Sequence, residues 1–156
     1  MFGNKYKKYN LIVEGDSTSS IVYYLQVYSN GKPLLFILDS GASCCLIGNT
    51  ALKGCQYSNV GIKDTTIGVG GEIATRTVLF SFDLNEQESV NGNHWFCIHF
   101  SVANKKDNKL FNNGEIAGLL GANFLQFCKV DFRNGTIKVY KKPGKVTKQL
   151  MPSFNI

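Results

Sequence analysis

Long apolar runs are absent from this sequence, and proline is scarce. The longest strongly apolar stretch is LLFIL at residues 34–38, whereas a helix that crosses a bilayer needs about 20 such residues. Only three of the 156 residues are prolines, 44% are hydrophobic and 18% are charged. This composition excludes wholesale disorder, coiled coils and collagen. Length and composition together predict one globular domain with its own core.

Arginine is scarce, although the chain is basic, and this scarcity argues against a nucleic-acid partner. The formal charge is +6, from 17 lysines and arginines against 11 acids. Only Arg76 and Arg133 offer the planar fork that suits phosphates and base edges. Residues 138–156 hold five lysines and no acid, so residues 1–137 carry 12 bases against 11 acids. We therefore expect no nucleic-acid and no membrane partner. The basic end is interpreted as solvated chain, with an anionic partner for it as the alternative.

The cysteines show no pairing pattern. They stand at positions 44, 45, 55, 97 and 128, an odd number without CxxC spacing, and do not indicate a disulfide framework. Residues 11–13 form too short an apolar stretch for a signal peptide, so a cytoplasmic location with reduced thiols is expected. His94, Cys97 and His99 could be zinc ligands, but on a strand His94 would face away from the other two. No metal is predicted.

Strand patterns cover most of the chain. β-Branched and aromatic residues predict strands at 9–14, 21–28, 33–38, 60–67, 73–82, 94–102, 129–132 and 136–140. Asn30-Gly31 and Asn134-Gly135 predict hairpin turns. One short helix is expected at 122–127, and residues 83–93 and 104–115 are expected to be polar loops. Many short strands with frequent turn signals predict an all-β barrel or sandwich.

Two short motifs have a catalytic and a structural interpretation. Gly15-Asp16-Ser17 is similar to the nucleophile block of one esterase family, but neither histidine follows an aspartate at the required short spacing. A polar turn between strands is the better interpretation. Gly68, Gly70 and Gly71 could form a phosphate loop, but such a loop needs a helix after it, and the following residues have a strand pattern. A hairpin tip is predicted there.

The segment LLFILDSGAS at residues 34–43 is the strongest candidate for chemistry. Asp39 ends a fully apolar strand, where a carboxylate loses solvation unless it is paired or hydrogen-bonded. Gly41 permits a sharp turn that brings backbone N–H groups toward the carboxylate, and Ser40 adds a hydroxyl. The alternative is a strand that simply ends in a polar turn.

From these residues, the chain resembles the retropepsins, the retroviral and retrotransposon aspartic proteases. Asp39-Ser40-Gly41-Ala42 is similar to the active-site loop of that family. IGVGGEI at residues 67–73 resembles its flap hairpin, and IAGLLGANFL at 116–125 resembles the strand and short helix behind the catalytic loop. The resemblance implies an all-β fold, a closed barrel with one short helix and a flap, over residues 1–140, followed by a basic tail at 141–156.

The resemblance also implies a site and a mechanism. Its residues would be the catalytic Asp39, Ser40 and Gly41; the substrate-binding and flap residues Ala42, Ile67, Gly68, Val69, Gly70 and Gly71; and the supporting Leu120, Gly121 and Asn123. The sequence contains one Asp-Ser-Gly, so a dyad of two aspartates requires a homodimer acting on a polypeptide, without metal or cofactor.

The chain departs from the family pattern at two positions, and two other functions are alternatives to that of an aspartic protease. Many viral members pair an aspartate with an arginine where this chain has Ser43 and Ala122. A catalytically silent dimerisation or peptide-binding domain on the same fold is the main alternative. A metal-dependent or thiol hydrolase that uses Cys44 or Cys45 would need a nearby histidine, which the sequence does not supply.

Overall fold

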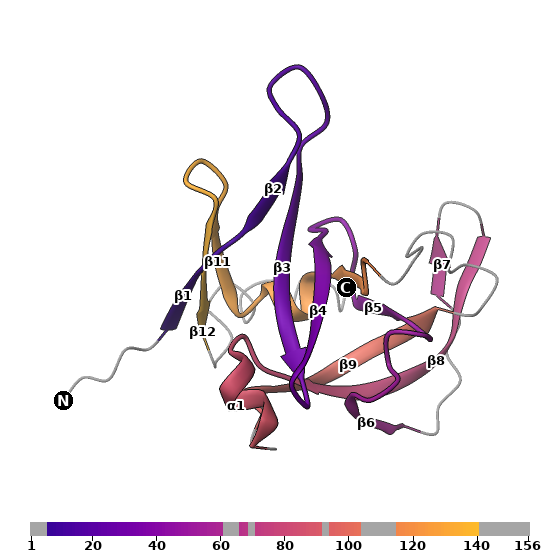
Figure 1. Cartoon of the computed structure of the whole chain (residues 1–156). Coiled ribbons are helices and arrows are strands. Elements are labelled where there is room, and N and C mark those ends of the chain that lie inside the picture. The colour runs from indigo at the N-terminus through magenta and orange to yellow at the C-terminus, as the bar shows by residue number, and fades with distance from the viewer. Residues whose placement is uncertain (1–5, 61–65, 69–70, 92–93, 104–114, 141–156) are drawn as a thin grey trace, which may run out of the picture.

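The computed structural model describes residues 6–60, 66–68, 71–91, 94–103 and 115–140, and most of its regular structure is β (Figure 1). The strands are β1 (Tyr6–Asn10), β2 (Ile12–Glu14), β3 (Val22–Ser29), β4 (Lys32–Leu38), β5 (Cys45–Gly48), β6 (Gln56–Asn59), β7 (Thr66–Gly68), β8 (Gly71–Phe82), β9 (Phe96–Ala103), β10 (Gly118–Leu120), β11 (Cys128–Asp131) and β12 (Thr136–Tyr140). Two short helices, α1 (Glu86–Val90) and α2 (Ala122–Leu125), complete the described elements. Within these ranges neither helix has the length or apolarity to cross a bilayer.

The strands form two sheets. The larger has the order β2-β3-β4-β10-β5-β9-β8-β6, with β7 paired to β8, and the smaller has the order β1-β12-β11. Figure 1 shows the small sheet beside the β2–β3 hairpin, with the β7–β8 hairpin on the other side of the molecule. The predicted β architecture is confirmed. Because β2 and β6 are the ends of the described order, the closed barrel stays a prediction.

Both predicted hairpin turns are present. β3 and β4 are joined by Asn30 and Gly31 alone, with φ of 50° and 77°, the conformation of a two-residue turn that follows the twist of the strands. β11 and β12 are joined by residues 132–135, and Gly135 has φ of 65°. The polar turn expected at Asp16 connects β2 with β3, where the carboxylate accepts hydrogen bonds from Thr18 and Ser19.

Phenylalanine rings fill the core between the layers of strands. Phe36, Phe80, Phe82, Phe100 and Phe124 are fully buried. Phe80 contacts Phe100 with ring centroids 4.9 Å apart, and Phe82 lies 5.7 Å from Phe124. Burying each such side chain is worth about 1.5–3 kcal/mol. The rings therefore connect β4, β8, β9 and α2 into one unit on which the loop after β4 rests.

Two parts of the sequence-based assignment were wrong, and a third is tested only at its ends. The expected loop at 83–93 contains α1, which begins because the Asn85 side chain accepts from the backbone N–H groups of Gln87 and Glu88. Of the strand expected at 60–67, residues 66 and 67 belong to β7, Val60 lies just after β6, and residues 61–65 are outside the described residues. The single strand expected at 9–14 is divided at Leu11, whose N–H donates to Gly135 at 2.8 Å, so β1 and β2 join different sheets.

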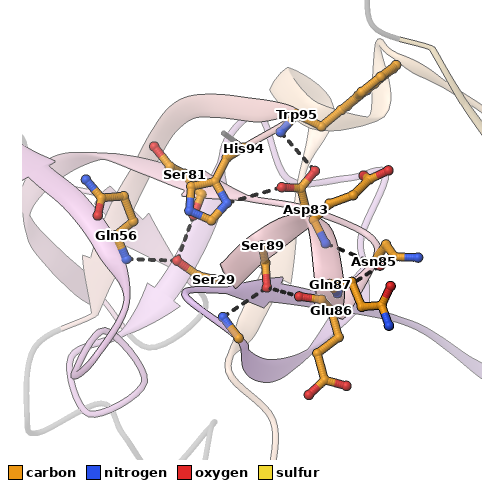
Figure 2. Close-up of polar contacts among 12 residues, drawn as sticks. Ser29, Gln56, Ser81, Asp83, Asn85, Glu86, Gln87, Ser89, His94 and Trp95 are labelled. Carbon is orange, nitrogen blue, oxygen red and sulfur yellow. Dashed lines mark hydrogen bonds and ion pairs between the residues drawn. The ribbon is translucent and has the colours of Figure 1, made fainter. Parts of the chain in front are cut away.

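A buried acid–base pair connects the end of β8 to the chain before β9 (Figure 2). Asp83 Oδ1 accepts from the Trp95 N–H at 2.9 Å, and Oδ2 lies 3.3 Å from His94 Nδ1. The two side chains are 1% and 3% exposed. Burial is the main cause that raises the pKa of Asp83 above its ordinary 3.8, outweighing the hydrogen bond from Trp95 and the charge of His94, both of which lower it.

The raised pKa of Asp83 predicts a pH-dependent stability. Protonated Asp83 stabilises the folded chain below pH 3.8, and this contribution is lost as pH rises through the raised folded-state pKa. Asp83→Asn removes this titrating group. The free energy of unfolding of the variant should therefore increase relative to that of wild type as pH rises from 3.8 toward neutrality. Denaturant unfolding at a series of pH values measures the difference.

Asp16→Asn is the matched control for this measurement. Hydrogen bonds from Thr18, and after it Ser19, lower the pKa of the exposed Asp16 below 3.8. The stability that Asp16 contributes is therefore present above that pH and lost on acidification. The free energy of unfolding of Asp16→Asn should therefore fall relative to that of wild type as pH rises, the opposite of the change in Asp83→Asn. If the free energy of unfolding of Asp83→Asn and that of wild type change with pH in the same way, burial does not raise the pKa of Asp83.

Candidate active site

Asp39 directly follows β4, in the middle of the large sheet. β4 lies between β3 and β10, and the Asp39 N–H donates to Leu120 O at 3.0 Å. This bond extends the parallel pairing of β4 with β10 beyond Leu38. Asp39 is half-buried, whereas Ser40 and Gly41 are exposed. The apolar strand β4 therefore holds the Asp39 carboxylate at a fixed position near the surface.

The loop after Asp39 folds back on the carboxylate. The Gly41 N–H donates to Asp39 Oδ1 at 3.0 Å, and the Ala42 N–H donates to Asp39 O at 3.1 Å. A Cβ at Gly41 would lie 3.3 Å from Asp39 Oδ1, so glycine leaves room for the carboxylate. The hydrogen bonding inferred from sequence for Gly41 is confirmed.

β10 and α2 hold this loop from behind. The Ala122 N–H donates to Ala42 O at 2.8 Å. Asn123 Oδ1 accepts from the Cys45 N–H, and Asn123 Nδ2 donates to His99 O, both at 2.8 Å. A Cβ at Gly121 would lie 2.4 Å from Cys44 O, so only glycine allows the two backbones to approach this closely. Leu120, Gly121 and Asn123 thus lie next to the Asp39 loop, and their supporting role stays a prediction.

Sequence reasoning missed the strand β5 and the contact that Cys45 makes from it with Gly121. All four residues of β5 are buried, and the Gly121 N–H donates to Cys45 Sγ at 3.4 Å. Burial raises the pKa of Cys45 to about 12, so this thiol stays protonated and is a poor nucleophile. The half-buried Cys44 lies 3.6 Å from Ser101 Oγ. The short apolar run CLIG was the available signal for β5, but its position between β10 and β9 requires the tertiary fold.

The glycine-rich segment forms a hairpin, as expected. β7 pairs antiparallel with β8, and Gly68 is the partner of Gly71. Ile67 and Gly68 belong to β7, and Gly71 begins β8. Val69 and Gly70, which the sequence places at the tip, lie outside the described residues.

The zinc interpretation finds no support in the described part of the chain. Cys97 and His99 are exposed on β9, whereas the His94 side chain is buried against Asp83. Among the described residues no group of three or more metal-ligating side chains gathers. Ser43 and Ala122, which replace the ion pair of many viral retropepsins, are both exposed.

Comparison with known proteins decides the family. A family model described as aspartyl protease matches residues 25–124, from β3 through the Asp39 loop and the β7–β8 hairpin to α2. The chain belongs to the aspartyl protease family. In fold, the chain is similar to a retropepsin-like aspartic protease from Rickettsia conorii, at 15% identity over 85% of this chain and 98% of that one, with a TM-score of 0.52. The resemblance to retropepsins is thus confirmed in family and fold.

A second solved structure is less similar in fold. EIAV protease in complex with the inhibitor HBY-793 matches at 21% identity over 66% of this chain and 84% of that chain, with a TM-score of 0.46. No curated protein matches this chain.

Proposed function

We propose that this chain is an aspartic endopeptidase in which two Asp39 carboxylates, one from each chain of a homodimer, activate water. The observation that carries the proposal is the Asp39-Ser40-Gly41 loop, with a half-buried carboxylate that accepts from the Gly41 N–H at 3.0 Å. Membership of the aspartyl protease family supports peptidase chemistry.

The other described aspartates support the proposal of a second chain. Asp16 accepts hydrogen bonds within its own turn, and Asp131 accepts two from Asn134. Asp83 is buried beside His94. Each of these described aspartates is engaged away from Asp39, and the sequence contains no second Asp-Ser-Gly. A twofold-symmetric pair of chains supplies the missing carboxylate.

The proposed reaction is general acid–base catalysis by the paired carboxylates. At a separation of about 3 Å two carboxylates cannot both be ionised, so they share one proton. The ionised Asp39 takes a proton from a water bound between the two, and this water attacks the peptide carbonyl. The protonated partner donates to the carbonyl oxygen. Ser40 and Gly41 hold the carboxylates in place, and the reaction needs neither metal nor cofactor.

The substrate would be an extended polypeptide. A peptide in this conformation gains main-chain hydrogen bonds as an added strand. The β7–β8 hairpin is proposed to close over it as a flap, with Ile67, Gly68, Val69, Gly70 and Gly71 excluding water and Ala42 lining the cleft. Leu120, Gly121 and Asn123 act as positioning residues for the loop.

Cleavage of a peptide library by the purified chain tests this function, with products identified by mass spectrometry. Defined cleavage sites are expected, together with inhibition by statine-type compounds that mimic the tetrahedral transition state. A metal chelator and a thiol-alkylating reagent should leave the activity intact. Loss of activity with the chelator would indicate a different chemistry. No cleavage of any peptide would favour a catalytically silent dimerisation or peptide-binding domain.

A further inference from the structure

Three lysines form a row across the outer face of the small sheet. Lys138 on the central strand β12 pairs directly with Lys8 on β1 and with Lys129 on β11. Neighbouring strands are about 4.8 Å apart, so the Cα atoms of this lysine row (Lys8, Lys138 and Lys129) lie along a line of about 10 Å. From this row and the aromatic rings beside it, we propose that the outer face of the small sheet binds single-stranded nucleic acid.

The lysine row has a cost in stability, which the cation–π contact of Lys138 with the Tyr6 ring offsets in part. Like charges directly opposite each other on a sheet are destabilising. Within the described residues the ion pairs are Lys7 with Glu88 and His94 with Asp83, and neither includes a member of the row. The neighbouring Asp131 accepts from Asn134 at 3.1 and 2.8 Å. These bonds are the main cause of its lowered pKa, and the charge of Lys8 contributes least. The row therefore favours an external anion.

Two tyrosine rings lie beside the row on the same face. Tyr6 and Tyr140 are paired across β1 and β12 on the same face, with centroids 5.4 Å apart, and Lys138 Nζ lies 4.8 Å from the Tyr6 centroid. Phe132 is 53% exposed, and its ring contacts Tyr23 with centroids 4.8 Å apart. All three lysines line a pocket of about 350 Å³, together with Asp131, Phe132 and Thr136.

Charge beside aromatic rings selects among anionic partners. An acidic polypeptide would use the lysines but has no need of the rings. Single-stranded nucleic acid uses both, because phosphates contact the lysines while unpaired bases stack on aromatic side chains. Lysines contact phosphate as point charges and read no base sequence, so binding should be independent of sequence.

The C-terminal sequence strengthens this assignment. Residues 141–156 follow directly after β12, the central strand of the sheet, and carry four lysines and no acid. The sequence argued against nucleic acid because arginines are scarce and residues 1–137 are nearly neutral. The strand register revises that expectation, because it brings three of the lysines into one row.

Fluorescence anisotropy with the full chain and a labelled single-stranded RNA of roughly 12 nucleotides tests the proposal. Wild type should bind, and the affinity should fall steeply between about 50 and 200 mM salt. The combined Lys8→Gln, Lys129→Gln and Lys138→Gln variant should bind about tenfold or more weakly, with the logarithmic salt slope reduced by about 2. Tyr140→Leu should weaken binding about fivefold or more without changing that slope.

Controls separate this proposal from misfolding and from other partners. Lys53→Gln removes one charge from an exposed position between β5 and β6 and should bind as wild type. The triple variant should unfold at the same or a higher temperature, because repulsion within the row is relieved. Unchanged RNA binding by the triple variant overturns the proposal. Equal competition by polyglutamate, with no effect of Tyr140→Leu, also overturns it and assigns the face to acidic polypeptides.

Discussion

Asp39→Asn is expected to lower peptide hydrolysis to less than about a thousandth of the wild-type rate, while the chain stays folded. The substitution keeps the volume of the side chain and its oxygen acceptor for the Gly41 N–H, a contact of 3.0 Å in wild type. It removes the ionised form that takes a proton from water. Initial rates on a peptide identified by the library measure the effect, and denaturant unfolding checks that stability is kept.

Asp16→Asn provides the matched control for that rate. Asp16 is also an aspartate in a serine-containing turn whose carboxylate accepts a backbone N–H, here from Thr18 at 2.9 Å. It lies between β2 and β3, away from the β4–β10 pairing that positions Asp39. Its removal should leave hydrolysis unchanged. Hydrolysis by purified Asp39→Asn at the wild-type rate would exclude the aspartic mechanism.

Catalysis is expected to require two chains. If each chain supplies one Asp39, specific activity should fall on dilution in step with the fraction of dimer. Sedimentation measures that fraction over the same concentrations. Adding an equal amount of Asp39→Asn chains should reduce the activity per wild-type chain to about half, because random pairing places half of those chains in mixed dimers.

Chains that carry Asp16→Asn are again the control, because they keep Asp39 and should not reduce the activity of wild type. Specific activity that stays constant down to concentrations at which sedimentation shows only monomer would contradict the two-chain site. In that case the second acid would have to come from the same chain.

Local rules were enough for the parts of the fold that depend on neighbouring residues. Asn30-Gly31 specified its turn because both residues readily adopt positive φ, and the apolar run before Asp39 specified a strand that ends in a carboxylate. The helix α1 carried a local signal as well, since Asn85 stands three residues before Glu88 in the pattern of a capped helix. That signal was overlooked because the segment is polar.

The sequence by itself therefore determined the β class, the hairpins and the identity of the candidate catalytic loop, since each depends on residues close together in the chain. Only the tertiary structure placed β10 between β4 and β5, where a Cβ at Gly118 would lie 1.8 Å from Leu46 O. It also paired Asp83 with His94 and aligned Lys8, Lys138 and Lys129. The strand positions and the lysine row join residues from distant parts of the chain, and strand register decides the row because a shift of one residue turns every side chain to the opposite face.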